Sequence, residues 1–303
     1  MSVDIKKIGT EQRNEKTIKI DLVSTYEMLV QMNNEDQLVA FAVKDALKQV
    51  ASLVDKIVEA FQKGGRLIYI GAGTSGRIGI LDAVECRPTF GVDDQMVMCL
   101  MAGGEKAFVT AQEGAEDNRE LAVLDLQRVG LNANDIVVGI AASGRTPYVL
   151  GGIQYAKERG SVTGGITTSP NSALASLVDY PIEAITGPEA VTGSTRLKSG
   201  TAQKMICNML STASMIKIGK VYENLMVDVL ATNEKLVMRT YSIIQTATSV
   251  SLDEAKEAYQ RFGSAKKAIF AILSGINEPN MVNHWLKLGH DNIREALKLV
   301  KND

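Results

Sequence analysis

Residues 67–91 constrain the possible fold more than any other part of the chain. They begin with a short apolar run of strand-forming residues, pass through a turn rich in glycine, serine and threonine, and continue in a helical pattern. Gly71, Gly73 and Gly76 punctuate the turn. A turn of this kind aims backbone N–H groups and the positive end of the helix at one point. The sequence therefore predicts an anion-binding turn at the carboxyl end of a buried strand.

The same alternation of apolar runs and amphipathic segments continues along the chain. The predicted strands cover residues 67–70, 96–101, 135–141, 161–167 and 180–184. The predicted helices between them cover residues 78–84, 106–127, 148–159 and 172–177. Strands that alternate with helices at this spacing favour an α/β fold with a doubly wound parallel sheet. Ligands of such sheets bind beyond the carboxyl ends of the strands.

Helices are expected on both sides of this core. Ser24 followed by Glu27 is typical of a helix N-cap, and the helical pattern continues to Phe61. Further helical patterns cover residues 199–220 and 223–240, and residues 251–303 are expected to form a small bundle. The predicted organisation is an N-terminal helical segment over 1–55, a sheet domain over 56–225 and a helical region over 226–303.

Composition excludes several classes of function. The chain has 303 residues, a net charge of −2 and no long basic run, so we expect no nucleic-acid partner. No apolar stretch reaches about 18 residues, which argues against a membrane span, and no export signal is visible. Cys86, Cys99 and Cys207 are odd in number and widely spaced, which favours buried free thiols in a cytoplasmic protein. The only histidines, His284 and His290, lie far from the glycine-rich loops, so we expect no metal site and no Ser-His-Asp triad.

Two loops share a design that suits a phosphate monoester. Residues 71–77 follow the first predicted strand and residues 142–147 follow the third, and both offer small residues, hydroxyls and an arginine before a helix. The residues predicted to bind phosphate are Thr74, Ser75, Ser143, Gly144 and Thr146. A dinucleotide site would use the first loop and an acid such as Glu105, but would leave the second loop unexplained. A purely structural glycine turn is a further alternative.

The segment 187–201 crowds donors at the entry to a helix. Ser194, Arg196 and Lys198 are candidates to bind a carboxylate or phosphate of the substrate, because arginine offers a bidentate fork and lysine a point charge. The alternative is a capped helix start with solvated charges.

The motifs GAGTSGR, DAVEC, ASGRTPY, GPEAVTGSTRLKSGT and ATNEKL, in this order, closely resemble the N-acetylmuramic acid 6-phosphate etherase family. This family is a branch of the sugar isomerase (SIS) superfamily and is related to the glucokinase regulatory protein. The resemblance implies an SIS-type fold, a C-terminal bundle similar to a ubiquitin-associated module, and a homodimer with sites near the interface. It also implies a lyase that uses no cofactor and cleaves the D-lactyl ether of N-acetylmuramate 6-phosphate, in recycling or catabolism of cell-wall amino sugars.

The resemblance also implies two catalytic carboxylates. Glu85 in DAVEC would protonate the departing lactate, and Glu116 would remove the C2 proton of the open-chain sugar. Helical spacing from Ile78 and Leu81 predicts that Glu85 lies on the apolar face of its helix, where burial raises the pKa of a carboxyl group. The alternatives are an ion pair of Glu85 with Arg87 and, for Glu116, one solvated charge in an acidic run.

Three points stay open in the sequence. Glu85 lies ten residues beyond Ser75, or ~15 Å along an unbroken helix, so either the helix ends early or Glu85 serves a site completed by another subunit. Val84 and Arg87 replace the serine and proline that are usual in the family. A phosphosugar isomerase and a non-catalytic sugar-phosphate sensor remain alternatives to the etherase, and only the etherase would release lactate.

Overall fold

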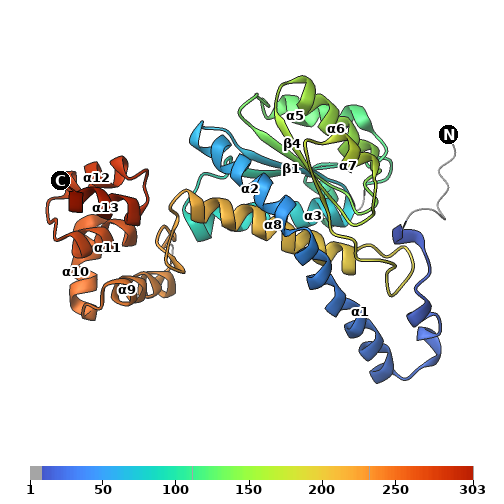
Figure 1. Ribbon diagram of the computed structural model, residues 1–303, viewed down its shortest axis with the longest axis horizontal. Helices are drawn as coiled ribbons and strands as arrows, with labels where there is room; N and C mark the ends of the chain where they lie inside the picture. Colours follow the sequence, from blue (N-terminus) through green and yellow to red (C-terminus); the bar gives the residue numbers. More distant parts are fainter. Residues whose placement is uncertain (1–8, 111, 232, 303) are drawn as a thin grey trace. The chain divides into compact units, whose positions relative to one another are not determined.

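The computed structural model describes residues 9–110, 112–231 and 233–302, and it contains the predicted parallel sheet. Five strands lie in the order β2-β1-β3-β4-β5, and every neighbouring pair is parallel (Figure 1). Their bounds are Leu67–Gly71 (β1), Val97–Met101 (β2), Ile136–Ile140 (β3), Val162–Thr167 (β4) and Tyr180–Glu183 (β5). Each strand falls within one residue or so of the range that its apolar run predicts. The α/β fold with a doubly wound sheet is confirmed.

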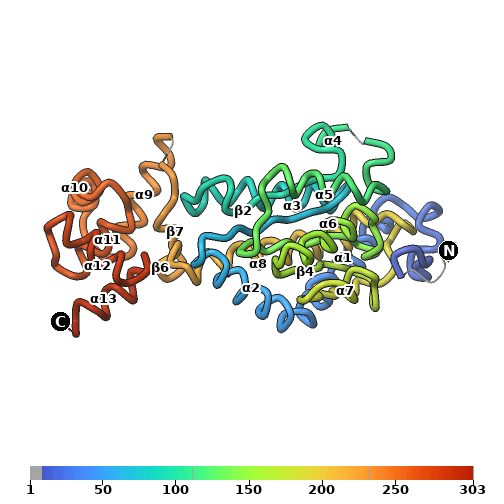
Figure 2. The backbone as a smooth tube through the Cα atoms, turned by 90° about the horizontal axis from the view of Figure 1, so that it is seen from above, coloured from blue at the N-terminus to red at the C-terminus, as the bar shows by residue number. Residues whose placement is uncertain are grey.

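Helices cover both faces of this sheet (Figures 1 and 2). One face packs against α5 (Arg119–Arg128), α6 (Pro147–Glu158) and α7 (Ala173–Leu177). The other face carries α2 (Leu47–Gln62), α3 (Gly73–Phe90) and α8 (Lys198–Lys217). Because both faces are covered, β1 and β3 are buried along their whole length, which explains their continuous apolar sequences.

A buried polar network holds α3 and α8 together under β1. The Asp82 carboxylate accepts hydrogen bonds from the Tyr69 hydroxyl (3.0 Å), from Asn208 Nδ2 (2.7 Å) and from Ser211 Oγ (2.9 Å). Burial raises the pKa of Asp82, and these three donors oppose that rise. These hydrogen bonds hold both helices against the sheet. The amino ends of α3 and α8 lie toward the same edge.

The N-terminal helices begin as predicted. Ser24 caps α1 (Thr25–Asp45), and Ser24 and Glu27 form the expected capping box. The helical pattern that runs to Phe61 is divided at Ala46, where α1 ends and α2 begins. From residue 9 onward, three short 3-10 helices precede α1, at Gly9–Glu11, Glu15–Thr17 and Ile20–Leu22.

Two predicted helices have other structures. The range 106–127 contains a short α4 (Lys106–Val109), a turn, and then α5, because Thr110 is extended and Asn118 caps a new helix by accepting from Leu121 N. The range 223–240 begins at the turn of a hairpin formed by β6 (Val221–Tyr222) and β7 (Leu225–Met226), and helix α9 (Glu234–Thr248) starts only after it. Glu223 at the hairpin turn has a φ of 55°, a left-handed conformation that no helix interior allows.

By residue contacts the chain divides into two compact units. The first holds the described residues up to Ala83 together with Gln95–Ser211, and therefore the whole five-stranded sheet. The second holds Val84–Asp94 and the chain from Thr212 onward. These limits differ from the boundaries at 55 and 225 that the sequence suggests.

The second unit contains the predicted C-terminal bundle. Its helices are α9, α10 (Leu252–Phe262), α11 (Ala265–Ser274), α12 (Pro279–Leu288) and α13 (Ile293–Asn302), and they share one apolar core. Ser251 and Glu254 form a capping box at the start of α10, and Gly263 ends it. Burial lowers the pKa of Lys266, whose ammonium nevertheless pairs with Asp228.

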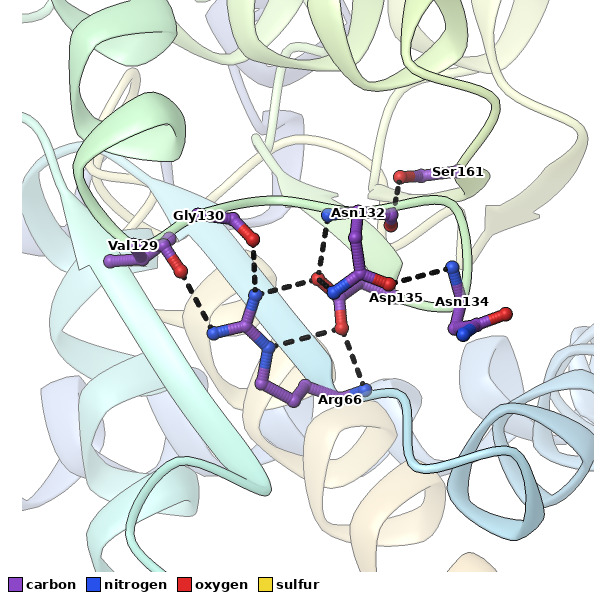
Figure 3. A network of polar contacts seen from close by, with 7 residues as sticks. All are labelled: Arg66, Val129, Gly130, Asn132, Asn134, Asp135 and Ser161. Carbon is purple, nitrogen blue, oxygen red and sulfur yellow. Dashed lines mark hydrogen bonds and ion pairs between the residues drawn. The ribbon is translucent and has the colours of Figure 1, made fainter.

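At the amino edge of the sheet a second polar network joins β1 to β3 (Figure 3). Arg66 donates from its backbone N and Nε to Asp135 Oδ1 (3.0 Å each) and from Nη2 to Asp135 Oδ2 (2.6 Å). Its guanidinium also donates to the carbonyls of Val129 and Gly130. Asn132 adds two donors to Asp135 Oδ2. The hydrogen bond to Asp135 raises the pKa of Arg66, so the guanidinium stays charged.

Candidate active site

The two predicted phosphate loops lie side by side at the carboxyl edge of the sheet. Gly71, the last residue of β1, pairs in register with Ile140, the last residue of β3. Thr74 and Ser75 occupy the first turn of α3, and the loop from Ser143 to Thr146 leads into α6. The structure thus brings together, at one edge, the hydroxyls and helix amino ends that the sequence suggested.

Two glycines in these loops are required by their surroundings. A Cβ at Gly76 would lie 2.9 Å from the carbonyl oxygen of Gly71 and 2.7 Å from Met101 Cγ, so Gly76 allows α3 to approach the strands. Gly144 has a φ of 62°, and a Cβ there would lie 2.3 Å from Ser172 Oγ. Gly144 is therefore needed for the loop conformation, in addition to any contact of its backbone with a ligand.

The loop hydroxyls have few partners within the described residues. Ser143 Oγ accepts one long hydrogen bond from Arg145 N (3.3 Å), and Thr146 begins α6 without a side-chain cap. Ser75 donates its proton to Gln203 Oε1 (2.9 Å). Hydroxyls and helix-start N–H groups with spare donors are what a phosphate monoester needs.

A cavity of about 110 Å³ opens beside the first turn of α3. It is lined by Ala72, Gly73, Arg77, Met101, Ala102, Ala107, Gln112 and Glu116. Arg77 fixes one wall, because its Nε donates to Phe108 O (2.7 Å) and its Nη2 donates to Ala107 O (2.8 Å). Glu116 lines the cavity from the turn before α5. Tyr148 N holds that turn by donating to the Glu116 carbonyl (2.9 Å).

Glu85 is not among the residues that line this cavity, and its predicted burial is wrong. Helix α3 buries Asp82, Ala83 and Cys86, whereas Glu85 is exposed and the neighbouring Val84 is 58% exposed. The buried face of the helix therefore does not include Glu85. Arg87 donates to Asp94. Since α3 is unbroken to Phe90, the possibility that the helix ends before Glu85 is excluded.

Lys198, predicted to bind an anionic group of the substrate, forms an ion pair within its own chain. Its side chain is almost fully buried, and Nζ donates to Glu35 Oε2 of α1 at 2.6 Å. Burial raises the pKa of Glu35, but the hydrogen bonds from Lys198 and Asn14 outweigh it and lower the pKa overall. The ammonium is thus engaged by a carboxylate of its own chain.

The amino end of α8 is likewise engaged by the chain itself. Glu189 is fully buried and accepts hydrogen bonds from Lys198 N and Ser199 N (2.9 Å each). A carboxylate at a helix amino end occupies the position where a substrate anion would bind. Of the three candidates in this segment, Arg196 is exposed and Ser194 half-buried, and among the described residues neither has a side-chain partner.

Sequence reasoning missed Gln203, Thr168 and Ser199, which join the loops to one another. Thr168 Oγ1, beyond β4, contacts Ser199 Oγ (2.9 Å) and Ala142 O (3.2 Å). Gln203 follows Ser199 by one helical turn and contacts Ser75. That spacing was visible in the sequence, but no local pattern indicates which helix faces the glycine turn.

Within the part of the chain that the structure describes, no group of three or more His, Cys, Asp or Glu side chains converges as metal ligands would. In the same residues, no helix combines the length and apolar character needed to span a bilayer.

The fold and the paired loops define an SIS-domain protein. Residues 125–213 match the SIS domain family, and residues 49–157 match the family described as glucokinase regulatory protein N-terminal SIS domain. A phosphoheptose isomerase from Neisseria gonorrhoeae has the same fold, with a TM-score of 0.50 and 14% identity over 63% of this chain and 98% of that chain.

Two curated relatives show to which family of SIS-domain proteins the chain is similar. A protein of Geobacillus sp. (strain WCH70), named N-acetylmuramic acid 6-phosphate etherase, is 57% identical over 89% of this chain and 92% of its own length. A protein of the same name from Exiguobacterium sp. (strain ATCC BAA-1283 / AT1b) is 51% identical over 97% of this chain and 100% of its own length. The chain belongs to the N-acetylmuramic acid 6-phosphate etherase family, and it is an enzyme.

Proposed function

We propose that this enzyme is a lyase that cleaves the D-lactyl ether of N-acetylmuramate 6-phosphate, in recycling or catabolism of cell-wall amino sugars. The products would be N-acetylglucosamine 6-phosphate and D-lactate. The observation that carries the proposal is the sequence identity of 51–57% to proteins named etherases over most of the chain. The geometry supports it, because a carboxylate, Glu116, lines a cavity beside a phosphate-type turn.

The proposed reaction is an elimination followed by addition of water. Glu116 removes the proton from C2 of the open-chain sugar, the electron pair forms the C2=C3 double bond, and the C3–O bond breaks. Glu85 gives its proton to the departing lactate oxygen. Water then adds to C3, and C2 regains a proton. The aldehyde at C1 makes the C2 proton removable, so carboxylate acid–base catalysis is sufficient.

We assign phosphate binding to the two loops. Ser75, Ser143 and Thr146 would donate from their hydroxyls, with Thr74 and the Gly144 backbone beside them. These groups gather at the amino ends of α3 and α6, where the helix dipoles favour an anion. Ser194 and Arg196 remain candidates for the lactyl carboxylate, whereas the ion pair of Lys198 with Glu35 argues for a structural role of that residue.

We further propose a homodimer in which Glu85 acts in the site of the partner subunit. Two features support it: Glu85 is exposed on an unbroken helix, and α1 exposes large apolar side chains, with Tyr26 76% and Phe41 64% exposed. An apolar face of this kind is typical of a surface that another chain covers. The free cysteines, Cys86, Cys99 and Cys207, are compatible with the reducing cytoplasm, where we place the enzyme.

The direct test measures D-lactate release from N-acetylmuramate 6-phosphate by wild type, Glu85→Ala and Glu116→Ala. We expect release by wild type and little by either variant. Glu120→Ala is the matched control, because it removes an exposed carboxylate a few residues from Glu116 that does not line the cavity. Folded wild type that binds the sugar phosphate but releases no lactate would overturn the etherase and favour the sensor.

A mixing experiment tests the shared site. If Glu85 acts in the partner's site, a mixture of Glu85→Ala and Glu116→Ala subunits re-forms intact sites in mixed dimers. Random pairing then restores about a quarter of wild-type activity. Failure of exchanged subunits to recover any activity would place both carboxylates in one subunit's site.

A further inference from the structure

Gln203 is a buried amide with an unused donor beside the phosphate loops. It lies in α8, its side chain is 1% exposed, and its Oε1 accepts the proton of the Ser75 hydroxyl at 2.9 Å. Its Nε2 is also buried and has no hydrogen-bond partner among the described residues. Buried polar groups are normally paired, so a buried NH₂ group without an acceptor at a candidate site calls for an explanation.

The direction of the hydrogen bond between Ser75 and Gln203 limits what Ser75 can do. A serine hydroxyl has a single proton, and Ser75 gives it to Gln203. A phosphate monoester near neutral pH offers mainly acceptor oxygens, so Ser75 cannot donate to it in this arrangement. Binding of phosphate by Ser75 would leave Gln203 Oε1 without its donor.

Rotation of the Gln203 amide by half a turn removes this conflict. Nε2 then donates to Ser75 Oγ, and the Ser75 proton is free to point at a phosphate oxygen. The unpaired NH₂ group gains an acceptor in the same movement. The rotation needs no backbone change, because an amide is similar in shape in both orientations.

The position of α8 is suited to this role. Tyr69 OH contacts Cys207 O (3.3 Å), and Asn208 Nδ2 contacts Asp82 (2.7 Å), one helical turn beyond Gln203. These contacts hold α8 against β1 and α3, so the amide of Gln203 remains within reach of Ser75. Ser199 Oγ, one turn before Gln203, is fixed by Thr168.

We propose that Gln203 is the positioning residue of the phosphate site, and that its amide reverses its hydrogen bond with Ser75 when the sugar phosphate binds. The inference rests on the proposed function, since it assumes that Ser75 binds the phosphate of the substrate. Gln203 acts through Ser75 and touches no reacting atom. Its contribution therefore belongs to binding of the phosphate and leaves the chemical step unaffected.

The test compares kcat and KM for N-acetylmuramate 6-phosphate in Ser75→Ala, Gln203→Met, Gln203→Glu and the double variant Ser75→Ala/Gln203→Met. We expect Gln203→Met to raise KM about 10-fold with kcat within about twofold, because a uniform binding interaction is lost. Gln203→Glu keeps the size of the side chain but only accepts at neutral pH, so it retains the Ser75 proton and raises KM further. In the double variant, Gln203→Met adds nothing to the effect of Ser75→Ala.

Gln154→Met is the matched control, because Gln154 is exposed and, among the described residues, its amide hydrogen-bonds only to Glu158 in the same helix. Its KM should equal that of wild type. Thermal melting of each variant distinguishes an effect on folding from an effect on binding. If Gln203→Met does not fold, Gln203→Glu tests the positioning role in its place.

The outcomes separate the inference from the function on which it rests. A raised KM in Ser75→Ala with an unchanged KM in both Gln203 variants overturns the positioning role and leaves the etherase intact. Effects of Ser75→Ala and Gln203→Met that add fully on KM also overturn it, because they would act independently. An unchanged KM in Ser75→Ala instead overturns the phosphate assignment itself.

Discussion

The two edges of the sheet differ in how completely their polar groups are hydrogen-bonded. At the amino edge Asp135 accepts five hydrogen bonds, three from Arg66 and two from Asn132, and the Arg66 guanidinium also reaches two carbonyls (Figure 3). At the carboxyl edge Ser143 accepts one long hydrogen bond, and Gln203 Nε2 has no acceptor among the described residues. The loops at both edges flank the same strands, since they enter β1 and β3 at the amino edge and leave them at the carboxyl edge.

This contrast separates stability from binding. A saturated network has no capacity left for a ligand, and its loss leaves several buried groups unpaired at once. Unused donors contribute little to stability, but they are available to an anion. Variants at the amino edge should therefore change unfolding, and variants at the carboxyl edge should change catalysis and binding.

The largest expected effect is that of Glu116→Gln on kcat. Removal of a general base lowers the rate by about 10²–10⁴-fold, whereas the side chain is exposed and its loss should change stability by less than about 0.5 kcal/mol. Lactate release and thermal melting measure the two quantities. If Glu116→Gln melted at a much lower temperature than wild type but kept its kcat, the proposed separation of stability from catalysis would be wrong.

Asp135→Ala, at the amino edge, should lower stability and leave catalysis unchanged. It leaves the guanidinium of Arg66 and two donors of Asn132 without their acceptor, which should cost about 3 kcal/mol of unfolding free energy. Urea unfolding measures this loss. The kcat and KM of the folded fraction should match those of wild type, and a changed KM would show that the two edges are coupled.

Gly144→Ala should change both the unfolding free energy and KM, each to a smaller extent. The φ of 62° and the approach of Ser172 Oγ make any Cβ strained there, at a cost of about 1–2 kcal/mol. The loop must shift to relieve the contact, which displaces Ser143 and Thr146 and raises KM. Gly130→Ala is a suitable control, because Gly130 also has a positive φ but has no atom near its Cβ position and lies at the amino edge.

The smallest effect is the pH dependence of Asp179 at the amino end of β5. Partial burial raises the pKa of Asp179, but hydrogen bonds from Thr163 and the Lys157 ammonium outweigh it and hold the pKa below its ordinary value of 3.8. A lowered folded-state pKa gives stability that is present above pH 3.8 and is lost as the pH falls through the folded value.

Asp179→Asn should therefore melt roughly 2 °C below wild type at pH 7, since the group is partly exposed and solvent screens the pair. The difference should shrink as the pH falls below 3.8. Melting curves across this range measure it. A difference that grows toward acid pH would contradict the assigned direction.

Local patterns were enough to predict the strands and most helix starts. The bounds of β1 to β5 lie close to the predicted ranges, and the cap of α1 at Ser24 is a short-range feature. The predictions that were wrong also have physical causes. The range 106–127 has a helical composition, but Thr110 is extended and Asn118 starts a new helix, and Lys198 is polar yet fully buried.

The α/β fold, the glycine turn after β1, the hydroxyl loop after β3 and the family of the chain follow from the sequence alone, because they depend on periodicity, turn chemistry and contiguous motifs. Which polar groups have partners became visible only in the folded chain. It pairs Lys198 with Glu35, exposes Glu85, turns Glu116 to the cavity and places Gln203 beside Ser75. The physical reason is that hydrogen bonds and burial depend on groups far apart in the chain, which no local pattern specifies.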